Sequence, residues 1–164
     1  TEIYTLSLHD ALPILLDLGV YPISFASMLF KQQPQKIITS HQMTQTGVDE
    51  SSVLVFEYPA GETAVLGSSI TTDFGKDIII AGTEGRICAS PIFCPQKVTL
   101  TAKGGKETPV EITSIGNGYN YEIAHVNKCV KTRITESTVM PLNESIDIMA
   151  TMDKIGRASC RERV

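Results

Sequence analysis

The spacing of hydrophobic positions changes twice along the chain, and each change predicts a different kind of element. Between residues 15 and 31, apolar side chains recur every three or four positions, which favours a helix. Pro22 lies inside this stretch and removes a backbone donor. We therefore expect a kink or a restart of the helix near Tyr21, and the polar and proline residues at 32–34 end it.

From residue 36 onwards the pattern becomes that of short strands separated by turns rich in glycine or proline. The expected strands cover residues 36–46, 51–58, 63–72, 77–82, 86–90, 97–102 and 109–115. Consecutive β-rich segments joined by short turns predict an antiparallel meander. Apolar and polar residues alternate in QMTQT and KVTLTA, which is typical of a sheet with one covered and one open face.

After Gly118 the helical spacing returns. The segment 120–131 places Ile123, Val126, Cys129 and Val130 on one face, and Pro141 then opens a second helix over 142–153. The order is one helix, a run of strands, and two more helices. The fold class that this order predicts is α+β, with a mainly antiparallel open sheet covered on one face by helices.

Composition narrows the class of protein further. The chain has 164 residues, 42% of them hydrophobic, and a net charge of −4. This length suits one domain with a core. A mildly acidic chain without a basic run is unlike a nucleic-acid-binding protein. Residues 11–30 are long enough to span a bilayer, but Asp17 and two prolines interrupt them, so we expect a buried helix instead.

The cysteines and histidines predict neither a metal site nor a disulfide framework. Four cysteines form no C-x-x-C motif, which favours reduced thiols in a cytoplasmic protein: Cys88, Cys94, Cys129 and Cys160. We expect the first three to be buried thiols. No carboxylate spacing around His41 or His125 suggests a set of metal ligands, so both are expected to pack or to face solvent.

Both ends of the chain look like translated adapter DNA. Residues 5–14 read TLSLHDALPI and residues 155–164 read IGRASCRERV. When the second segment is back-translated, its reverse complement, shifted by one base, encodes the first. The DNA also resembles a common sequencing-library adapter. We therefore assign 1–14 and 155–164 as adapter-derived, place the genuine domain at 15–154, and expect the gene to continue beyond both ends.

Asp17 and Tyr21 are the best candidates for chemistry. Their spacing of four residues places a carboxylate and a phenol on one helical face. Such a pair could polarise or protonate a hydroxyl or carbonyl group of a substrate. The spacing alone fits equally simple structural roles, with Asp17 as a cap or ion-pair partner and Tyr21 as a half-buried aromatic. Without further information the structural interpretation is favoured.

The glycines at 116 and 118 resemble part of a dinucleotide-binding fingerprint. They follow a predicted strand and precede a helix, but the position of the third glycine is Tyr121. The following region is also helix and loop rather than the next strand of a βαβ unit. We interpret these residues as a helix-entry turn and assign no cofactor-binding residue.

Several motifs occur in an order that is specific as a set. They are LLDLGVYPISFA, TGVDE, a hairpin with Tyr58-x-x-Gly61, IAGTEGRI, GYNYEIAHVNKCV, TES and MPLNESIDIMATMD. With these motifs, residues 15–154 resemble the C-terminal domain of the Gfo/Idh/MocA oxidoreductases. The branch with the dihydrodiol dehydrogenases and glucose–fructose oxidoreductases is the most similar one.

The resemblance implies an enzyme whose cofactor domain lies outside this chain. That domain binds NAD or NADP and carries a catalytic lysine in a Glu-Lys-Pro motif, which does not occur here. The present domain would supply one wall of the substrate site, and the open face of its sheet would join subunits of a homo-oligomer. The implied substrate is a sugar, polyol or cyclic diol, and the chain alone is expected to be inactive.

The resemblance also changes the interpretation of the helical pair. Asp17 and Tyr21 match the family's D-x-G-x-Y helix, whose aspartate and tyrosine lie next to the substrate. Hydride would pass between nicotinamide and a hydroxyl-bearing carbon. A lysine and Tyr21 would handle the proton, and Asp17 would orient or tune them.

The chain departs from the family pattern at three places. Adapter-derived sequence replaces the glycines that usually precede the first helix, and Cys94 stands where an aromatic is usual. Arg133 replaces a glycine, which predicts a non-glycine residue in a left-handed turn. An alternative to the enzyme is a non-catalytic module that dimerises through its sheet or binds a ligand. A small β-barrel carrier fits the terminal helices poorly.

Overall fold

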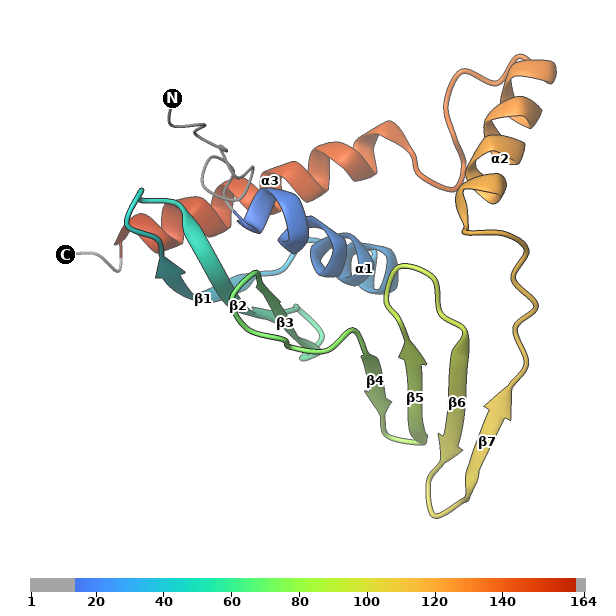
Figure 1. Ribbon diagram of the computed structural model, residues 1–164, viewed down its shortest axis with the longest axis horizontal. Helices are drawn as coiled ribbons and strands as arrows, with labels where there is room; N and C mark the ends of the chain where they lie inside the picture. Colours follow the sequence, from blue (N-terminus) through green and yellow to red (C-terminus); the bar gives the residue numbers. More distant parts are fainter. Residues whose placement is uncertain (1–13, 162–164) are drawn as a thin grey trace, which may run out of the picture. The chain divides into compact units, whose positions relative to one another are not determined.

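The computed structural model describes residues 14–161, which form two compact units (Figure 1). The first unit comprises residues 14–74 and 142–161, and the second comprises residues 75–141. Elements of the first unit are η2 (Leu15–Gly19), α1 (Val20–Phe30), β1 (Lys36–Met43), β2 (Asp49–Glu57), β3 (Thr63–Ser69) and α3 (Leu142–Arg161). Elements of the second are β4 (Ile78–Gly82), β5 (Gly85–Ser90), β6 (Lys97–Ala102), β7 (Glu107–Val110) and α2 (Tyr119–Lys131).

The expected restart of the first helix is confirmed. Its first turn, η2, is a π-helix, and regular α-helix begins at Val20, two residues before Pro22. Proline cannot donate a backbone hydrogen bond, and a wider turn just before it accommodates the missing donor. Helix α1 ends at Phe30, and Lys31 takes a left-handed conformation with φ 52°.

The core of the first unit lies between its sheet and its helices. Strands β1, β2 and β3 pair in that order, all antiparallel. Side chains on β2 alternate, so that Leu54 and Phe56 point into the core while Val53 is partly exposed. Helices α1 and α3 contribute the rest of the buried cluster, with Ile23, Ile148, Met152 and Ile155. Both helices therefore cover the same face of this sheet.

Tyr58 closes this core at the end of β2. Its ring is 1% exposed and lies 4.2 Å from that of Phe30, centroid to centroid. The Tyr58 amide donates to the Glu62 carbonyl across the turn, and Gly61 has a φ of 96° there. Burial raises the pKa of the Tyr58 phenol.

The strands of the second unit form a separate antiparallel sheet in the order β4, β5, β6, β7. Ile78 is the one residue of this unit that is buried within the described part of the chain. The α+β class with antiparallel strands is thus confirmed. We expected one continuous sheet, whereas the hydrogen bonding forms two. Residues 70–77, between β3 and β4, form no strand that could join them.

The seventh strand lies earlier in the chain than we expected. It covers Glu107–Val110, and residues 111–115, predicted to be strand, are not. Val110 pairs with Val98, near the start of β6 at Lys97. Pro95 lies just before that start and offers no donor, so residues beyond Val110 have no strand to pair with.

Two local predictions about turns are confirmed. Helix α2 begins at Tyr119 after Gly118, which has a φ of 99°, as expected of a helix-entry turn. Arg133 adopts a φ of 57°, the left-handed conformation inferred from the glycine that it replaces. No helix within residues 14–161 is long and apolar enough to cross a membrane.

Helix α3 passes through the predicted domain end at residue 154 without interruption. We expected the helix to cover 142–153, and it continues to Arg161. Ile155, the first residue of the segment that we predicted to be adapter-derived, is 0% exposed and belongs to the core. The boundary inferred from the DNA therefore has no counterpart in the secondary structure, and it stays a prediction from the sequence. Most of the other terminal segment, residues 1–13, lies outside the described residues.

Candidate functional site

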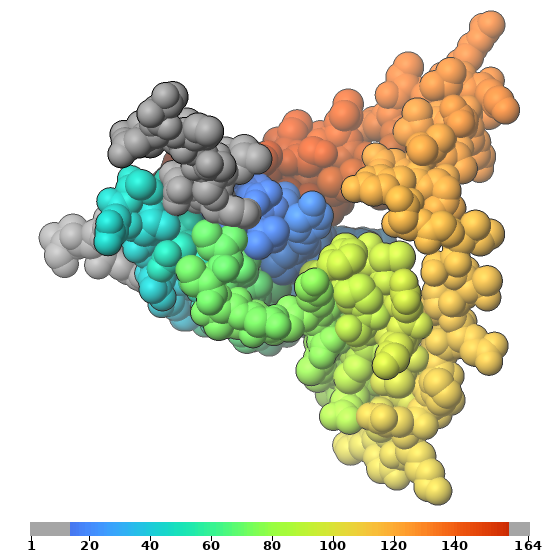
Figure 2. Space-filling model, viewed as in Figure 1, coloured from blue at the N-terminus to red at the C-terminus, as the bar shows by residue number. Residues whose placement is uncertain are grey.

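Asp17 and Tyr21 both lie on the exposed side of the first helix. Asp17 belongs to η2 and is exposed, and Tyr21 belongs to α1 and is 55% exposed. On the opposite side, Gly19 and Ile23 are buried. Within residues 14–161 neither the carboxylate nor the phenol makes a hydrogen bond or an ion pair, so both groups are available to a ligand. Figure 2 shows part of this segment, in blue, at the molecular surface.

Gly19 explains why this helix begins so close to the sheet. A Cβ atom at Gly19 would lie 3.0 Å from Leu15 Cδ1 and 3.4 Å from the Ser68 hydroxyl of β3. The first contact is with the end of a flexible side chain of the same helix, which would have to shift by a few tenths of an ångström, and the second is an ordinary van der Waals contact. The glycine between Asp17 and Tyr21 thus lets the helix start pack closely against Leu15 and Ser68.

A buried carboxylate on β2 holds the same helix start. Asp49 Oδ2 accepts the Leu15 amide at 2.9 Å and the Ser52 hydroxyl at 2.9 Å. Since the hydroxyl hydrogen of Ser52 points to Asp49, Ser52 accepts from His41 Nδ1, 2.7 Å away. A carboxylate at a helix N-terminus is electrostatically favourable and satisfies a free amide. Asp49 therefore orients the segment that carries Asp17.

Sequence reasoning missed this role of Asp49. The TGVDE segment contributed to the family resemblance, but by itself it indicates only a turn between strands. The two hydrogen-bonded groups of Asp49 and Leu15 are 34 residues apart, and the second is a backbone amide. The signal available in the sequence for this role was a lone aspartate at the start of a β-rich segment. A carboxylate on a buried strand requires a hydrogen-bond or charge partner.

The other candidate residues do not join the Asp17–Tyr21 pair. His41 belongs to the buried network below η2, and His125 lies on α2 in the second unit. Cys88, Cys94 and Cys129 are free and half-buried, which corrects our expectation of buried thiols. Cys88 lies on β5, Cys129 on α2 and Cys94 in the loop after β5. All three belong to the second unit, in which Ile78 is the one buried residue among those described. Over the described residues, no group of three or more His, Cys, Asp or Glu side chains is arranged to hold a metal.

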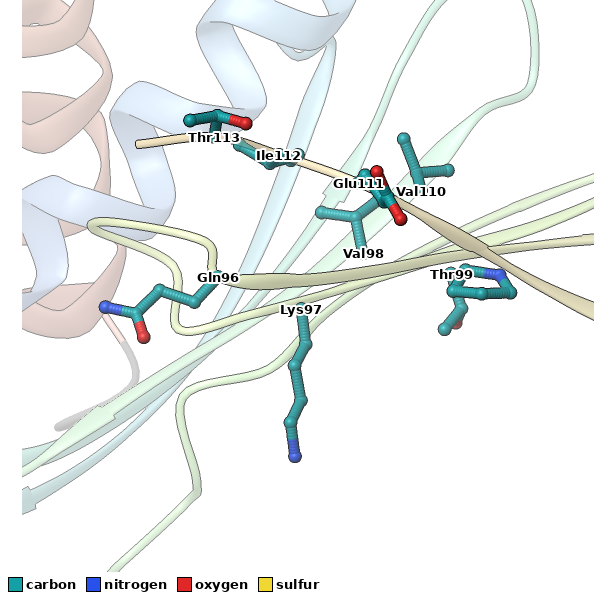
Figure 3. A pocket seen from close by; sticks show the side chains of 9 residues that line it. Gln96, Lys97, Val98, Thr99, Val110, Glu111, Ile112 and Thr113 are labelled. Carbon is teal, nitrogen blue, oxygen red and sulfur yellow. The ribbon is translucent and has the colours of Figure 1, made fainter. Parts of the chain in front are cut away.

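A shallow groove in the second unit follows β6 and β7 (Figure 3). Val98, Val110 and Ile112 give it apolar walls, and Lys97 and Glu111 are its charged side chains. Figure 3 shows Lys97 extending away from Val98 on the same strand. Because adjacent residues of a strand point to opposite faces, the lysine and the apolar wall are separated. The groove lacks the acid–phenol pair that the first helix presents.

Comparison with known proteins finds similarity to one family of oxidoreductases. Residues 11–88 match the family model described as the GFO/IDH/MocA C-terminal domain. Trans-1,2-dihydrobenzene-1,2-diol dehydrogenase of Homo sapiens is 30% identical over 152 residues, covering 88% of this chain and 45% of that protein. The enzyme of the same name from Mus musculus is 32% identical, covering 80% of this chain and 41% of the relative. The chain therefore spans less than half the length of these relatives.

Solved structures show the same fold at low identity. An aldose–aldose oxidoreductase from Caulobacter crescentus, complexed with glycerol, superposes with a TM-score of 0.79 at 18% identity, covering 92% of this chain and 46% of that one. An oxidoreductase from Agrobacterium radiobacter, in complex with NAD+, L-tartaric acid and magnesium, has a TM-score of 0.66 at 14% identity, covering 92% and 48%. These likenesses concern the fold alone.

Proposed function

Since residues 11–88 match the C-terminal domain of the GFO/IDH/MocA oxidoreductases, we propose that this chain belongs to that family and supplies the substrate site and the subunit interface of an NAD(P)-dependent enzyme. The substrate would be a sugar, a polyol or a cyclic diol. The observation that carries this proposal is the exposed Asp17–Tyr21 pair on a helix start that packs closely at Gly19 and is hydrogen-bonded by Asp49. A carboxylate and a phenol that make no hydrogen bond or ion pair within residues 14–161, on a helix start held by buried contacts, suit a binding site.

The names of the relatives support the substrate class. The human and mouse relatives are named as dehydrogenases of a cyclic diol. Among the solved structures, one oxidoreductase acts on aldoses and holds glycerol, and another holds NAD+ and a hydroxy acid. These molecules share a hydroxyl group on a carbon that can lose hydride. A phenol beside a carboxylate suits recognition of such a hydroxyl.

In the proposed reaction the residues of this chain handle the substrate hydroxyl. The phenol of Tyr21 would hydrogen-bond that hydroxyl and exchange a proton with it. Asp17, in the preceding turn, can accept a hydrogen bond and so orient the substrate or the phenol. The nicotinamide, held by a separate domain, supplies the hydride chemistry when bound. A lysine expected in that domain would share the proton with Tyr21.

The chain alone and the chain extended upstream are expected to differ in activity. We expect no reduction of NAD+ or NADP+ by the 164 residues, because the nucleotide would have no binding domain. The same chain joined to the domain encoded upstream should reduce one of these nucleotides in the presence of a polyol, an aldose or a cyclic diol. Absorbance of the reduced nicotinamide measures both. Turnover by neither protein would favour the non-catalytic alternative.

Rows of apolar side chains on the open faces of both sheets support the proposed subunit interface. On the first sheet, Ile38, Val55 and Val65 lie side by side across three strands, and Val65 is 72% exposed. On the second sheet, Ile80 pairs with Ile87, which pairs with Leu100. Rows of apolar side chains on open sheet faces are typical of surfaces that associate. The same rows would serve a non-catalytic dimerisation module, our second candidate.

A charged residue in the second of these rows is expected to weaken self-association. Leu100 lies on β6 and is 46% exposed, so Leu100→Asp should disturb folding little. Burying its carboxylate in an apolar interface should raise the dissociation constant of the dimer by about 30-fold or more. Light scattering after size-exclusion chromatography measures this change.

The neighbouring residue on the same strand provides the matched control. Thr99 points to the opposite face of β6, so Thr99→Asp adds the same charge without entering the apolar row. It should leave the dissociation constant within about twofold. A wild-type chain that stays monomeric, or equal weakening by both variants, would remove this row from the interface.

A further inference from the structure

Three side chains of the second unit meet beside α2: His125, Cys129 and Ser137. His125 and Cys129 lie one turn apart on this helix, with Cys129 Sγ 3.5 Å from His125 Nε2. Ser137, in the link that follows the helix, places its Oγ 2.9 Å from the same nitrogen. All three residues are half-buried, so the cluster remains open to small molecules.

The hydrogen bonds around Ser137 fix the role of the imidazole nitrogen. Ser137 Oγ accepts the amides of Val139 at 3.1 Å and Met140 at 3.0 Å. With both of its lone pairs in use, the hydroxyl donates its own hydrogen to His125 Nε2. The neutral imidazole therefore carries its proton on Nδ1, and Nε2 is an acceptor. The Cys129 sulfur lies 3.5 Å from the same nitrogen, so the Ser137 hydroxyl and the Cys129 thiol share its single lone pair. Transfer of the thiol proton to Nε2 therefore displaces the hydrogen bond from Ser137.

The surroundings of Cys129 differ from those of the other two described thiols. Lys128 and Lys131 are the basic residues of the last turn of α2, which also carries Cys129. The His125 imidazole is the side chain that hydrogen-bonds the Cys129 thiol. Cys88 and Cys94 have no histidine within hydrogen-bond distance among the described residues.

We propose that Cys129 is a site of thiol–disulfide exchange with small disulfides such as glutathione disulfide, and that His125 accepts its proton. The sulfur of Cys129 attacks one sulfur of the disulfide as the thiol proton moves to His125 Nε2. A new bond joins Cys129 to that sulfur, the original disulfide bond breaks, and the second thiolate leaves with the proton from the imidazole. The cysteine is oxidised and the leaving thiol is the reduced product.

The experiment uses the whole 164-residue chain with Cys160→Ser, so that only Cys88, Cys94 and Cys129 can react. The chain is exposed to limiting glutathione disulfide, and peptide mass spectrometry identifies which cysteine is modified first. Exchange rates are then measured with the coloured disulfide 5,5′-dithiobis(2-nitrobenzoate). We expect Cys129 to be modified first, and His125→Gln to slow its exchange by about tenfold or more.

Lys128→Gln is the matched control, since it removes a charge next to Cys129 and leaves the imidazole in place. It should change the rate by less than about threefold. Cys88→Ser and Cys94→Ser should keep the fast reaction, and Cys129→Ser should abolish it. First modification at Cys88 or Cys94 would overturn the proposal. An unchanged exchange rate in His125→Gln, with an unchanged circular dichroism spectrum, would also overturn the proposal. If that variant unfolds, the proposal is tested by which cysteine of the parent chain is modified first.

Discussion

Replacing Tyr21 with Phe in the chain joined to its cofactor domain is expected to lower kcat by about 100-fold or more. The phenol is 55% exposed and makes no hydrogen bond within residues 14–161. Its removal should therefore leave the fold unchanged and take away only the group that exchanges a proton with the substrate. Because we place the nicotinamide on the other domain, its dissociation constant should stay nearly the same. Steady-state kinetics and a nucleotide titration measure the two quantities.

Another exposed tyrosine provides the control for this variant. Tyr119, at the start of α2, is 66% exposed and lies in the second unit. Tyr119→Phe should leave kcat within about twofold. Asp17→Asn should act in the same direction as Tyr21→Phe, with a smaller loss of about tenfold, because an amide can still orient a hydroxyl. An unchanged kcat in Tyr21→Phe would remove this tyrosine from the mechanism.

Phe56→Ala is expected to destabilise the first unit by about 3–5 kcal/mol. The side chain is 1% exposed and lies near the end of β2, in the cluster formed with α1 and α3. Truncation would remove its buried surface and leave a cavity that these elements cannot close without moving. A urea titration followed by circular dichroism measures the change in the free energy of unfolding.

A phenylalanine on the surface provides the control, because its replacement removes the same ring without removing core packing. Phe93 is 65% exposed, and its ring lies 5.7 Å from the Lys76 ammonium. Phe93→Ala should cost less than about 1 kcal/mol, the range of an exposed cation–π contact. If Phe56→Ala cost no more than Phe93→Ala, the assigned core of the first unit would be wrong.

Features encoded by neighbouring residues could be predicted from the sequence. The restart before Pro22 follows from one missing amide, and the left-handed Arg133 follows from the glycine usual at that position. The alternation on β2 separates Leu54 and Phe56 from Val53, as a two-residue period requires. The restart and the alternation depend on covalent structure and on periodicity over a few residues, so a single chain is sufficient to find them, whereas Arg133 also required the family resemblance.

Features that depend on contacts between distant residues could not be predicted. The bond from Leu15 to Asp49 joins residues 34 apart, and the bond from His125 to Ser137 joins a helix to an irregular link. The end of β7 at Val110 depends on where its partner β6 begins. The extent of α3 depends on burial of Ile155 in a core that other segments build. Local patterns do not identify the distant partner in any of these contacts.

The proposed roles of Asp17 and Tyr21 combine a local sequence pattern with contacts between distant residues. By itself, their spacing favours a structural interpretation, with Asp17 as a cap or ion-pair partner and Tyr21 as a half-buried aromatic. The structure adds that both side chains face solvent, on a helix start that packs closely at Gly19 and is hydrogen-bonded by Asp49. Geometry of this kind shows that the pair is available and positioned. The substrate itself can be assigned only when the cofactor domain is present.

Reading the source gene upstream of codon 15 tests the central claim most directly. We predict a native coding sequence for a strand, a glycine-rich turn and a helix, followed further on by Glu-Lys-Pro. That result would make this chain the substrate-side domain of a dehydrogenase. A start codon close to residue 15, or an unrelated domain in that position, would contradict the account and leave the two sheets as a binding or dimerisation module.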